Sequence, residues 1–297
     1  MPGASIMEGS AMSTPLEPGS EEHKSGRIPY FHGSAAIEQR RLARRTAATS
    51  GGFFMPYLRP GMSVLDCGCG PGSISLGLAE AVANGEVVGI DMQTAQVDRA
   101  RALAAERGVT NVRFEVGSVD ELPFPNASFD AAFAMTVMEH VREPLRALRE
   151  MKRVLKPGGV VGIADDDGAT VLWEPRTPRL TQALGLFLRL IEYHGGNPYG
   201  ARHNRQRLLQ AGFVRPIATA SIWGGGVWGT PEETRDLGVW FADQLSMPVT
   251  VEVVTSQGWA DHATLDAIYA ELLAWGERPD AYFAVMGVAA VGWVDDY

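Results

Sequence analysis

A short apolar run that ends in three alternating glycines constrains this chain more than any other feature. Residues 63–67 read Ser-Val-Leu-Asp-Cys, the composition of a short buried strand. Gly68, Gly70 and Gly72 follow, and residues 73–82 then have helical spacing. Glycines let the backbone approach a ligand closely, and the first turn of a helix offers unpaired N–H groups. The sequence therefore predicts a strand, a glycine turn and a helix that together hold a nucleotide-like ligand.

Two acidic residues narrow the class of ligand that the sequence predicts. Asp66 precedes the first glycine, and the glycines read G-x-G-x-G, whereas the dinucleotide fingerprint is G-x-G-x-x-G. A second apolar run, residues 86–90, ends in Asp91. An acid at the end of the second strand is well placed to accept hydrogen bonds from the two hydroxyls of a ribose. These residues predict a bound nucleoside and disfavour a nicotinamide dinucleotide.

Strands and helices alternate along the next part of the chain. A helix is expected over residues 94–107, with Thr94 as its N-cap and Gly108 as its end. This alternation is typical of an α/β fold, in which a doubly wound parallel sheet is covered by helices on both faces. The other elements expected here are strands at 112–116, 128–135 and 160–164 and a helix at 144–155.

Two stretches of this region, Val64–Gly72 and Val88–Asp91, resemble the class I S-adenosylmethionine-dependent methyltransferases. The resemblance covers residues 57–164 and implies a Rossmann-like, seven-stranded, mostly parallel sheet. It also implies S-adenosyl-L-methionine as the cofactor and S-adenosyl-L-homocysteine as the product. Four further motifs are similar to the ubiquinone/menaquinone-biosynthesis-type branch: Gly117–Pro125, Phe129-Asp, Met138-Glu-His-Val and Leu155-Lys-Pro-Gly-Gly.

The same resemblance implies roles for individual residues. Asp66 would orient the glycine loop and the methionine moiety, Asp91 would bind the ribose hydroxyls, and Thr136 would lie near the methionine portion. A turn-capping Asp66 and a helix-capping Asp91 are the structural alternatives. The residues implied at the cofactor are Asp66, Gly68, Cys69, Gly70, Gly72, Asp91, Met92, Gln93, Ser118, Val119, Thr136 and Tyr30.

The adenine side departs from the family pattern. Where the branch has Gly-Asp, whose carboxylate binds the adenine amino group, this chain has Gly117-Ser118. We favour the Ser118 hydroxyl together with the backbone of Val119, since a hydroxyl also accepts hydrogen bonds. Asp120, two residues further on, is the alternative.

The segment before the first strand folds over the cofactor in the resembled family. In this chain it contains Tyr30, His32 and Arg45, each a candidate for the cofactor carboxylate. The structural alternative is that the arginines of this segment lie on a solvated face of a helix.

Methyl transfer requires donor and acceptor to be held in line, and an oxygen or nitrogen acceptor also needs a group that takes its proton. His140, just past the fourth strand, and His194 are the candidate bases. His203 and the acids Asp165–Asp167 are the alternatives. The structural interpretation of the histidines is a position at a helix start for His140 and packing at the surface or in the lid for His194 and His203. The acids are expected to be mostly solvated. A carbon acceptor can react without a strong base.

Two long insertions follow the core, at residues 165–200 and 224–281. In an open α/β sheet both would lie at the carboxyl ends of the strands, where ligands bind, so we expect them to form a substrate lid. Helices are expected at 180–193, 201–211, 231–245 and 262–275, and strands at 213–223 and 282–291.

Tryptophans gather in and beside the second insertion. We interpret them either as a small helical core or dimer contact, or as an aromatic substrate chamber. They are Trp223, Trp228, Trp240, Trp259 and Trp275.

The length and the net charge of the chain limit which classes of protein it can belong to. The 297 residues suit one elaborated domain. The net charge of −9 argues against a nucleic-acid partner. No apolar run reaches the roughly 18 residues of a membrane span, and the first residues lack the apolar stretch of a signal peptide. The expected division is a disordered tail (1–26), a helical cap (27–56), a cofactor-binding core (57–164) and the rest of the sheet with the lid (165–297).

Cys67 and Cys69 are the only cysteines, and both lie in the glycine turn. They are poorly spaced to bridge each other and too few for a metal site, so we expect no metal. A reducing cytoplasm is the default location for such a chain.

The sequence therefore predicts an S-adenosylmethionine-dependent methyltransferase that transfers a methyl group to oxygen, nitrogen or carbon of a small apolar or aromatic metabolite. Its partner would be that acceptor, and a homodimer is left open. One alternative is an enzyme that uses the bound cofactor for its charge in a cyclisation, rearrangement or decarboxylation. Another is a cofactor-binding partner subunit.

Overall fold

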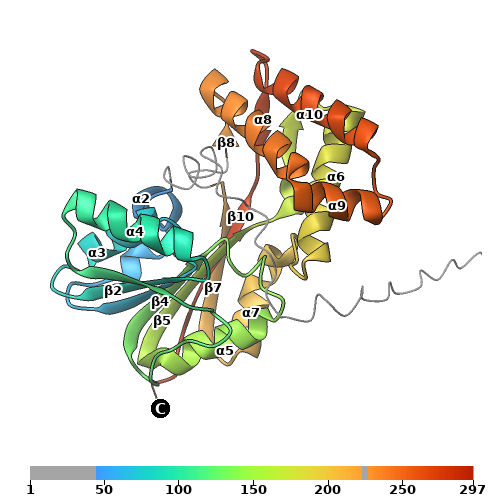
Figure 1. Ribbon diagram of the computed structural model, residues 1–297. Coiled ribbons are helices and arrows are strands. Elements are labelled where there is room, and N and C mark those ends of the chain that lie inside the picture. The colour runs from blue at the N-terminus through green and yellow to red at the C-terminus, as the bar shows by residue number, and fades with distance from the viewer. Residues whose placement is uncertain (1–44, 223–226, 297) are drawn as a thin grey trace, which may run out of the picture.

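The computed structural model describes residues 45–222 and 227–296, with a seven-stranded sheet at its centre (Figure 1). From edge to edge this sheet contains β3 (Val112–Val116), β2 (Glu86–Asp91), β1 (Ser63–Cys67), β4 (Phe129–Met135), β5 (Leu155–Asp166), β10 (Gly287–Trp293) and β7 (Val214–Ser221). The first five pair in parallel, and β10 runs antiparallel to both of its neighbours. The predicted doubly wound, mostly parallel sheet is confirmed.

Helices cover both faces of this sheet. One face carries α2 (Ala47–Ser50), the 3-10 turn η2 (Met55–Tyr57), α3 (Ser73–Ala81) and α4 (Thr94–Arg107), and the other carries α5 (Pro144–Val154) and α7 (Asn204–Gln210). Each face has its own apolar core, because successive side chains of a strand point to opposite sides. In β1, Val64 packs into the core on one face and Leu65 into the core on the other.

The ends of the helices follow their sequence signals, with one exception. Gly108 ends α4 with a left-handed φ of 64°, and Pro144 opens α5. The prediction that Thr94 caps α4 is wrong: Thr94 is the first helical residue, and Gln93 occupies the cap position. The Asp91 carboxylate accepts the N–H of Gln93 at 2.9 Å, and this bond fixes where the helix starts.

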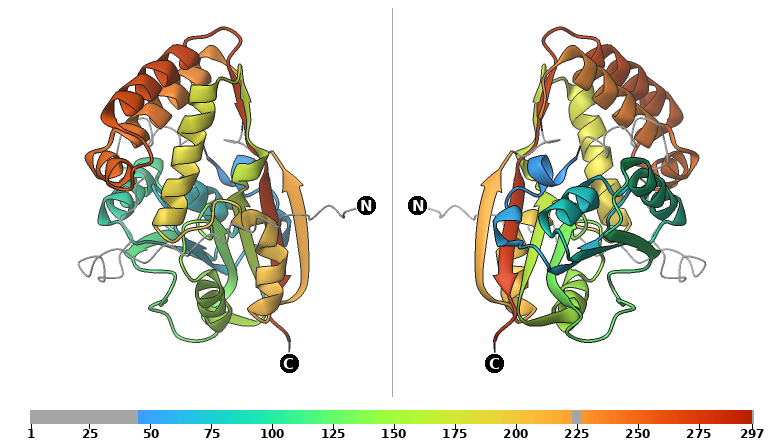
Figure 2. Two further views of the ribbon diagram at one scale, coloured as in Figure 1. Left: turned by 90° about the vertical axis from the view of Figure 1, so that its right-hand side faces the viewer. Right: turned by 90° about the vertical axis from the view of Figure 1, so that its left-hand side faces the viewer.

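The two insertions leave the carboxyl edge of the sheet and form a second layer beyond it (Figure 2). The first contains η3 (Gly168–Thr170), β6 (Leu172–Glu174), α6 (Pro178–Tyr193) and the 3-10 turn η4 (Gly200–His203). The second contains β8 (Val227–Trp228), α8 (Pro231–Ser246), α9 (Pro248–Ser256), α10 (His262–Gly276) and β9 (Tyr282–Ala284). β6, β9 and β8 form a small antiparallel sheet of their own. We call these two insertions the lid.

The lid and the segments beside it differ from the sequence prediction in several places. The strand predicted over 282–291 is two strands, because β9 pairs within the lid and β10 within the main sheet. The helix α9 was not predicted, since its Val- and Thr-rich composition favours a strand. The helix predicted over 201–211 begins as η4 and becomes helical only in α7.

The lid has an apolar core separate from those of the sheet. Trp228, Trp240 and Trp275 are buried in it, and Trp259 packs against it partly buried. The interpretation as a packed core therefore holds for Trp259 and Trp275. Trp228 and Trp240 also line a cavity beneath the lid, so the interpretation of these two as part of a substrate chamber stays a prediction. Trp223 lies outside the described residues.

Several predictions concern parts of the chain that the structure does not describe or test. The predicted tail and the candidates Tyr30 and His32 lie outside the described residues. The domain boundaries remain predictions. Within the described ranges, no helix has both the length and the apolar character needed to cross a membrane.

Gly72 yields a prediction about stability. Its φ is +84°, and a Cβ there would lie 2.9 Å from atoms of Ala100 and Phe114. We expect Gly72→Ala to lower the free energy of unfolding by about 2–4 kcal/mol, because a left-handed backbone costs roughly 1–2 kcal/mol and overpacking adds to it. Gly108→Ala is the matched control, since Gly108 has a φ of +64° but open space around it. Urea unfolding that gives equal losses for the two variants would contradict this account.

Candidate cofactor site

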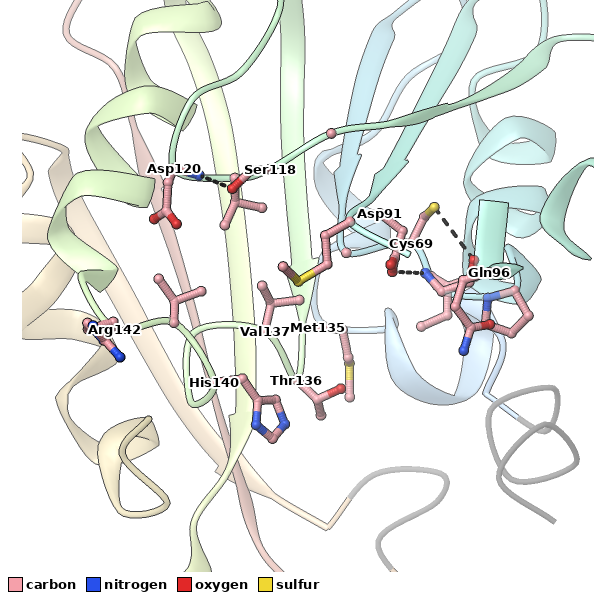
Figure 3. Close-up of a pocket in the computed structure, with 18 of the residues that line it drawn as sticks. Cys69, Asp91, Gln96, Ser118, Asp120, Met135, Thr136, Val137, His140 and Arg142 are labelled. Carbon is pink, nitrogen blue, oxygen red and sulfur yellow. Dashed lines mark hydrogen bonds between the residues drawn. The ribbon is translucent and has the colours of Figure 1, made fainter. Parts of the chain in front are cut away.

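A cavity of about 410 Å³ opens at the carboxyl ends of β1, β2 and β4 (Figure 3). Small-molecule sites usually have about 300–1,000 Å³. The walls come from the glycine turn, the end of β2, the loops after β3 and β4, and the end of α6. The predicted site residues that line it are Gly68, Cys69, Gly70, Asp91, Met92, Ser118, Val119, Thr136, His140 and His194.

The glycine turn is folded back onto the end of β2. The Gly68 N–H donates to the Ile90 carbonyl oxygen at 2.8 Å. Asp91 Oδ2 accepts the N–H of Gly70 at 3.0 Å, and its Oδ1 accepts the N–H of Gln93. Burial raises the pKa of Asp91, and these two hydrogen bonds oppose the rise. A carboxylate held in this way keeps lone pairs for two neighbouring hydroxyl groups.

Asp66, Gly72 and Gln93 do not line the cavity. Asp66 is buried beneath the turn, where Ser75 Oγ donates to its Oδ2 at 2.6 Å. Burial raises the pKa of Asp66 to about 7, while the Ser75 hydrogen bond lowers it and the nearby charge of Asp91 raises it further. This position suits a residue that supports the glycine turn from below.

The thiols of the turn carry no reactive chemistry. Burial raises the pKa of both Cys67 and Cys69, and the thiolate is the reactive form of cysteine. Among the described residues, no group of three or more His, Cys, Asp or Glu side chains is arranged to hold a metal ion.

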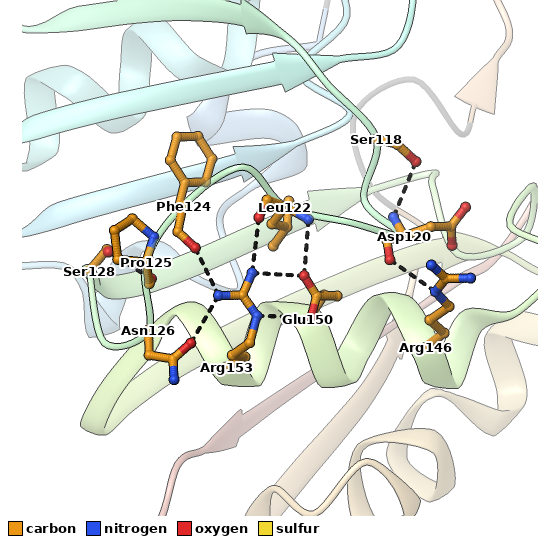
Figure 4. A network of polar contacts seen from close by, with 10 residues as sticks. All are labelled: Ser118, Asp120, Leu122, Phe124, Pro125, Asn126, Ser128, Arg146, Glu150 and Arg153. Carbon is orange, nitrogen blue, oxygen red and sulfur yellow. Dashed lines mark hydrogen bonds and ion pairs between the residues drawn. The ribbon is translucent and has the colours of Figure 1, made fainter.

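The loop after β3 carries Ser118 and Asp120 and is fastened to α5 (Figure 4). Arg153 Nη2 donates to the Leu122 carbonyl oxygen at 2.9 Å, and Arg146 Nε donates to that of Asp120 at 3.0 Å. The Ser118 hydroxyl accepts the Asp120 N–H at 3.2 Å. The structure thus brings both candidates for the adenine amino group to one wall of the cavity.

Two buried oxygen atoms of lining residues have no hydrogen-bond partner within the part of the chain that the structure describes: Gln96 Oε1 and Asp120 Oδ1. Sequence reasoning missed Gln96, although a polar residue on the buried face of a helix is a detectable signal. An adenosyl group fits these acceptors, because its ribose hydroxyls and adenine amino group are hydrogen-bond donors.

Asp165 holds the loop after β4, which forms another wall. Its Oδ1 accepts the N–H groups of Val137 and Glu139 at 3.0 and 3.2 Å, and its Oδ2 accepts from Asn204 Nδ2 at 3.0 Å. Burial raises the pKa of Asp165, and the hydrogen bonds from Asn204 and the Glu139 N–H oppose the rise. The loop is therefore fixed from β5 and α7.

The same loop meets a buried arginine. Thr136 has a left-handed φ of 52°, and its Oγ1 accepts a hydrogen bond from Arg45 Nη1 at 2.7 Å. Arg45 Nη2 also lies 3.9 Å from Asp166 Oδ2. Arg45 lines the cavity and is the one of the three N-terminal candidates that the structure describes.

The expectation that the acids at 165–167 are mostly solvated is wrong. Asp165 and Asp167 are buried, and Arg202 forms a bidentate ion pair with Asp167 at 2.7 Å. The physical reason is that β5 continues to Asp166, so all three acids lie under the lid rather than in an open turn.

The histidines divide into two groups. His140 and His194 line the cavity, and His140 Nε2 lies 3.5 Å from Glu139 Oε1. The ring of His194 packs edge-on against Tyr193 at the end of α6. His203 instead lines a separate groove between α5 and α7.

Residues 58–183 match the family model for a methyltransferase domain. The chain is 34% identical over 189 residues to an uncharacterised methyltransferase of Schizosaccharomyces pombe, covering 61% of this chain and 68% of that protein. It is 29% identical over 267 residues to a probable methyltransferase, ltbC, of Aspergillus luteorubrus, covering 84% and 91%. A demethylmenaquinone methyltransferase of Staphylococcus aureus is 34% identical over 135 residues, covering 45% and 53%.

Among solved structures, the [4+2]-cyclase SpnF matches with a TM-score of 0.50 and 25% identity, covering 88% of this chain and 85% of that one. The sheet and its nucleoside-sized cavity define a Rossmann-like α/β protein of the nucleoside-binding class. Together with the relatives, they show that this chain belongs to the S-adenosylmethionine-dependent methyltransferases, and S-adenosyl-L-methionine is its cofactor. The predicted family is confirmed.

The buried Asp66 makes stability depend on pH. Its pKa rises from 3.8 to about 7 on folding, so the folded chain binds more protons than the unfolded chain between these values. The contribution of Asp66 is therefore fully present below about pH 4 and is lost as the pH rises through about 7, by about 4 kcal/mol at most. We expect Asp66→Asn to gain stability relative to the wild type as the pH rises from 5 to 8. Urea unfolding at each pH measures this, with the exposed Glu121→Gln as the control; parallel profiles for all three proteins would rule it out.

Proposed function

We propose that this chain transfers the methyl group of S-adenosylmethionine to oxygen, nitrogen or carbon of a small apolar or aromatic acceptor in the cytoplasm. The observation that carries the proposal is the position of the loop after β4, where Thr136 and His140 lie between the cofactor cavity and the lid. The family defines the donor, and apolar side chains of the lid line a cavity beside this loop, which we assign to the acceptor. The cofactor contributes a sulfonium methyl group that is open to nucleophilic attack.

The residues of the cavity mainly bind and orient. We assign the ribose hydroxyls to Asp91 and the space beside Gly68 and Gly70 to the methionine portion, with Arg45 near its carboxylate. Alignment of this kind can lower a barrier by about 7–11 kcal/mol without any change in the chemistry. Asp165 contributes indirectly, since it fixes the loop that carries Thr136.

His140 is the residue we propose as the proton acceptor for an oxygen or nitrogen substrate. As the acceptor atom bonds to the methyl carbon and the carbon–sulfur bond breaks, the acceptor's proton moves to the imidazole. The Glu139 carboxylate, 3.5 Å from Nε2, favours the protonated ring. His194 lies in the same cavity and is the second candidate.

A cyclisation without methyl transfer is the second candidate function. The likeness to the [4+2]-cyclase SpnF, at 25% identity across most of both chains, supports it. In that case the same residues would bind the cofactor, and the lid would hold the folded substrate.

An assay with methyl-labelled S-adenosylmethionine and a panel of phenols, amines and quinones separates these functions. The proposal expects label in the product and release of S-adenosylhomocysteine. Conversion of a substrate with all label left in the cofactor would instead establish the cyclase function.

For the adenine amino group we propose Asp120 in place of Ser118, because Asp120 Oδ1 is buried without a hydrogen-bond partner among the described residues, whereas the Ser118 hydroxyl accepts the Asp120 N–H. Asp120→Ala should weaken binding of S-adenosylhomocysteine about 10–100-fold, the usual range for a hydrogen bond to a charged group. Binding of S-inosylhomocysteine, which lacks the amino group, should change little. Calorimetry measures both, with Ser118→Ala as the matched variant. A selective loss in Ser118→Ala alone would return the role to Ser118.

His140→Gln should lower kcat for an oxygen or nitrogen acceptor about 100-fold or more, the usual contribution of a general base. The affinity for S-adenosylhomocysteine should stay the same, since the proposed role concerns the acceptor. Rates are measured with the acceptor found in the labelling assay, beside His194→Gln. An unchanged kcat in His140→Gln together with a large loss in His194→Gln would transfer the role to His194.

A further inference from the structure

A groove of about 490 Å³ lies between α5 and α7, beside the cofactor cavity. The two helices run along the same face of the main sheet (Figure 1). The groove shares only Glu143 and Arg146 with the cofactor cavity, so most of its wall belongs to it alone. No step of the proposed methyl transfer uses this groove, although its volume is that of a small-molecule site. We call it the α5–α7 groove.

The two helices present hydrogen-bond donors to the groove at regular helical spacing. Arg146 and Arg149 lie three residues apart on α5, and Gln206 and Gln210 lie four apart on α7. Residues three or four apart share one face of a helix, so each helix directs a row of donors into the same space. The full set of donors is Arg146, Arg149, His203, Gln206, Arg207 and Gln210.

The groove is positively charged, although the chain as a whole has a net charge of −9. Its three arginines face a single acid, Glu143, whose carboxylate lies 3.8 Å from Arg146 Nη1. Arg149 and Arg207 form no ion pair with any carboxylate among residues 45–222 and 227–296. The first turn of α5 adds partial positive charge at the same place. These charges favour an anion.

Arg207 is the most informative of these residues because it is buried, with only 8% of its surface exposed. The one hydrogen bond of its guanidinium within the described chain is a long one, 3.4 Å from Nη1 to Asn204 Oδ1. Burial lowers the pKa of Arg207, and the negative charge of Asp165 opposes this. A buried guanidinium with so few partners has N–H groups left for a ligand, and a bound anion would offset the loss of its hydration.

The number of donors distinguishes between kinds of anion. The side chains of Arg149, His203, Gln206 and Gln210 have no hydrogen-bond partner in the part of the chain that is described. A phosphate group has three terminal oxygens and a charge of about −1.5 to −2 at pH 7, whereas a carboxylate has two oxygens and one charge. Guanidinium groups also bind phosphate through two parallel hydrogen bonds. The donors therefore suit phosphate better than carboxylate.

We propose that the α5–α7 groove binds the phosphate group of a small phosphorylated metabolite, with Arg149 and Arg207 as its main ligands and the Gln206 amide beside them. The site is distinct from the cofactor cavity and goes beyond the proposed methyl transfer, which does not require it. A concave groove between two helices suits a free small molecule rather than a flat charged surface.

Calorimetric titration with glycerol 3-phosphate at constant ionic strength tests the proposal, both without and with saturating S-adenosylhomocysteine. The wild type should bind one equivalent in both conditions. Arg149→Gln should bind about 10–100-fold more weakly, the usual effect of losing a hydrogen bond to a charged group. Arg107→Gln is the matched control, because Arg107 is an exposed arginine on α4, at the other face of the sheet. It makes the same change in net charge and should bind like the wild type.

A second variant and a second ligand make the test specific. Gln206→Glu places a carboxylate in the groove and should also weaken binding at least tenfold, and sodium acetate at the same ionic strength should not compete. Absence of binding to the wild type, or equal binding by the wild type and Arg149→Gln, would overturn the proposal. So would loss of binding when S-adenosylhomocysteine is added, since the phosphate would then lie in the cofactor cavity. Failure to bind S-adenosylhomocysteine itself would instead contradict the proposed function.

Discussion

The hydrogen bond from the Gly70 N–H to the Asp91 carboxylate is the interaction on which the site depends most. It joins the turn after β1 to the end of β2, so that one carboxylate both shapes the glycine turn and faces the cavity. Asp66 supports the same turn from below through Ser75. Asp66 is buried and Asp91 is partly buried, so both carboxylates lose hydration free energy in the folded protein. In return, the site holds carboxylate oxygens at fixed positions, where they accept hydrogen bonds from a nucleoside that also carries a positive charge.

Another buried acid, Asp165, connects the cofactor side of the site to the acceptor side. Asp165 lies at the end of β5, next to the start of the lid. Its carboxylate fixes the loop that carries Thr136 and His140. Asn204, from beyond the first insertion, bonds to the same carboxylate. The lid and the reactive loop are therefore anchored at one place. This explains how two insertions with a separate core can close over a site that the main sheet builds.

Much of the main sheet could be predicted from the sequence because its signals are local. β1 to β4 begin or end within a residue of their predicted positions, since apolar runs and glycines mark their limits. The division of residues 282–293 into β9 and β10 depends on pairing with two different sheets, which no local pattern shows. The burial of Asp165 and Asp167 depends likewise on partners far along the chain. Ser118 was favoured from its position, whereas the unpartnered Asp120 oxygen is visible only in three dimensions.

The central claim is that the glycine turn and Asp91 hold the cofactor while the loop after β4 faces its methyl group. A crystal structure with S-adenosylhomocysteine tests this most directly. The account predicts both ribose hydroxyls within hydrogen-bond distance of the Asp91 carboxylate, and the sulfur atom beside Thr136. Density for the ligand at another site, or with its ribose away from Asp91, would contradict the account.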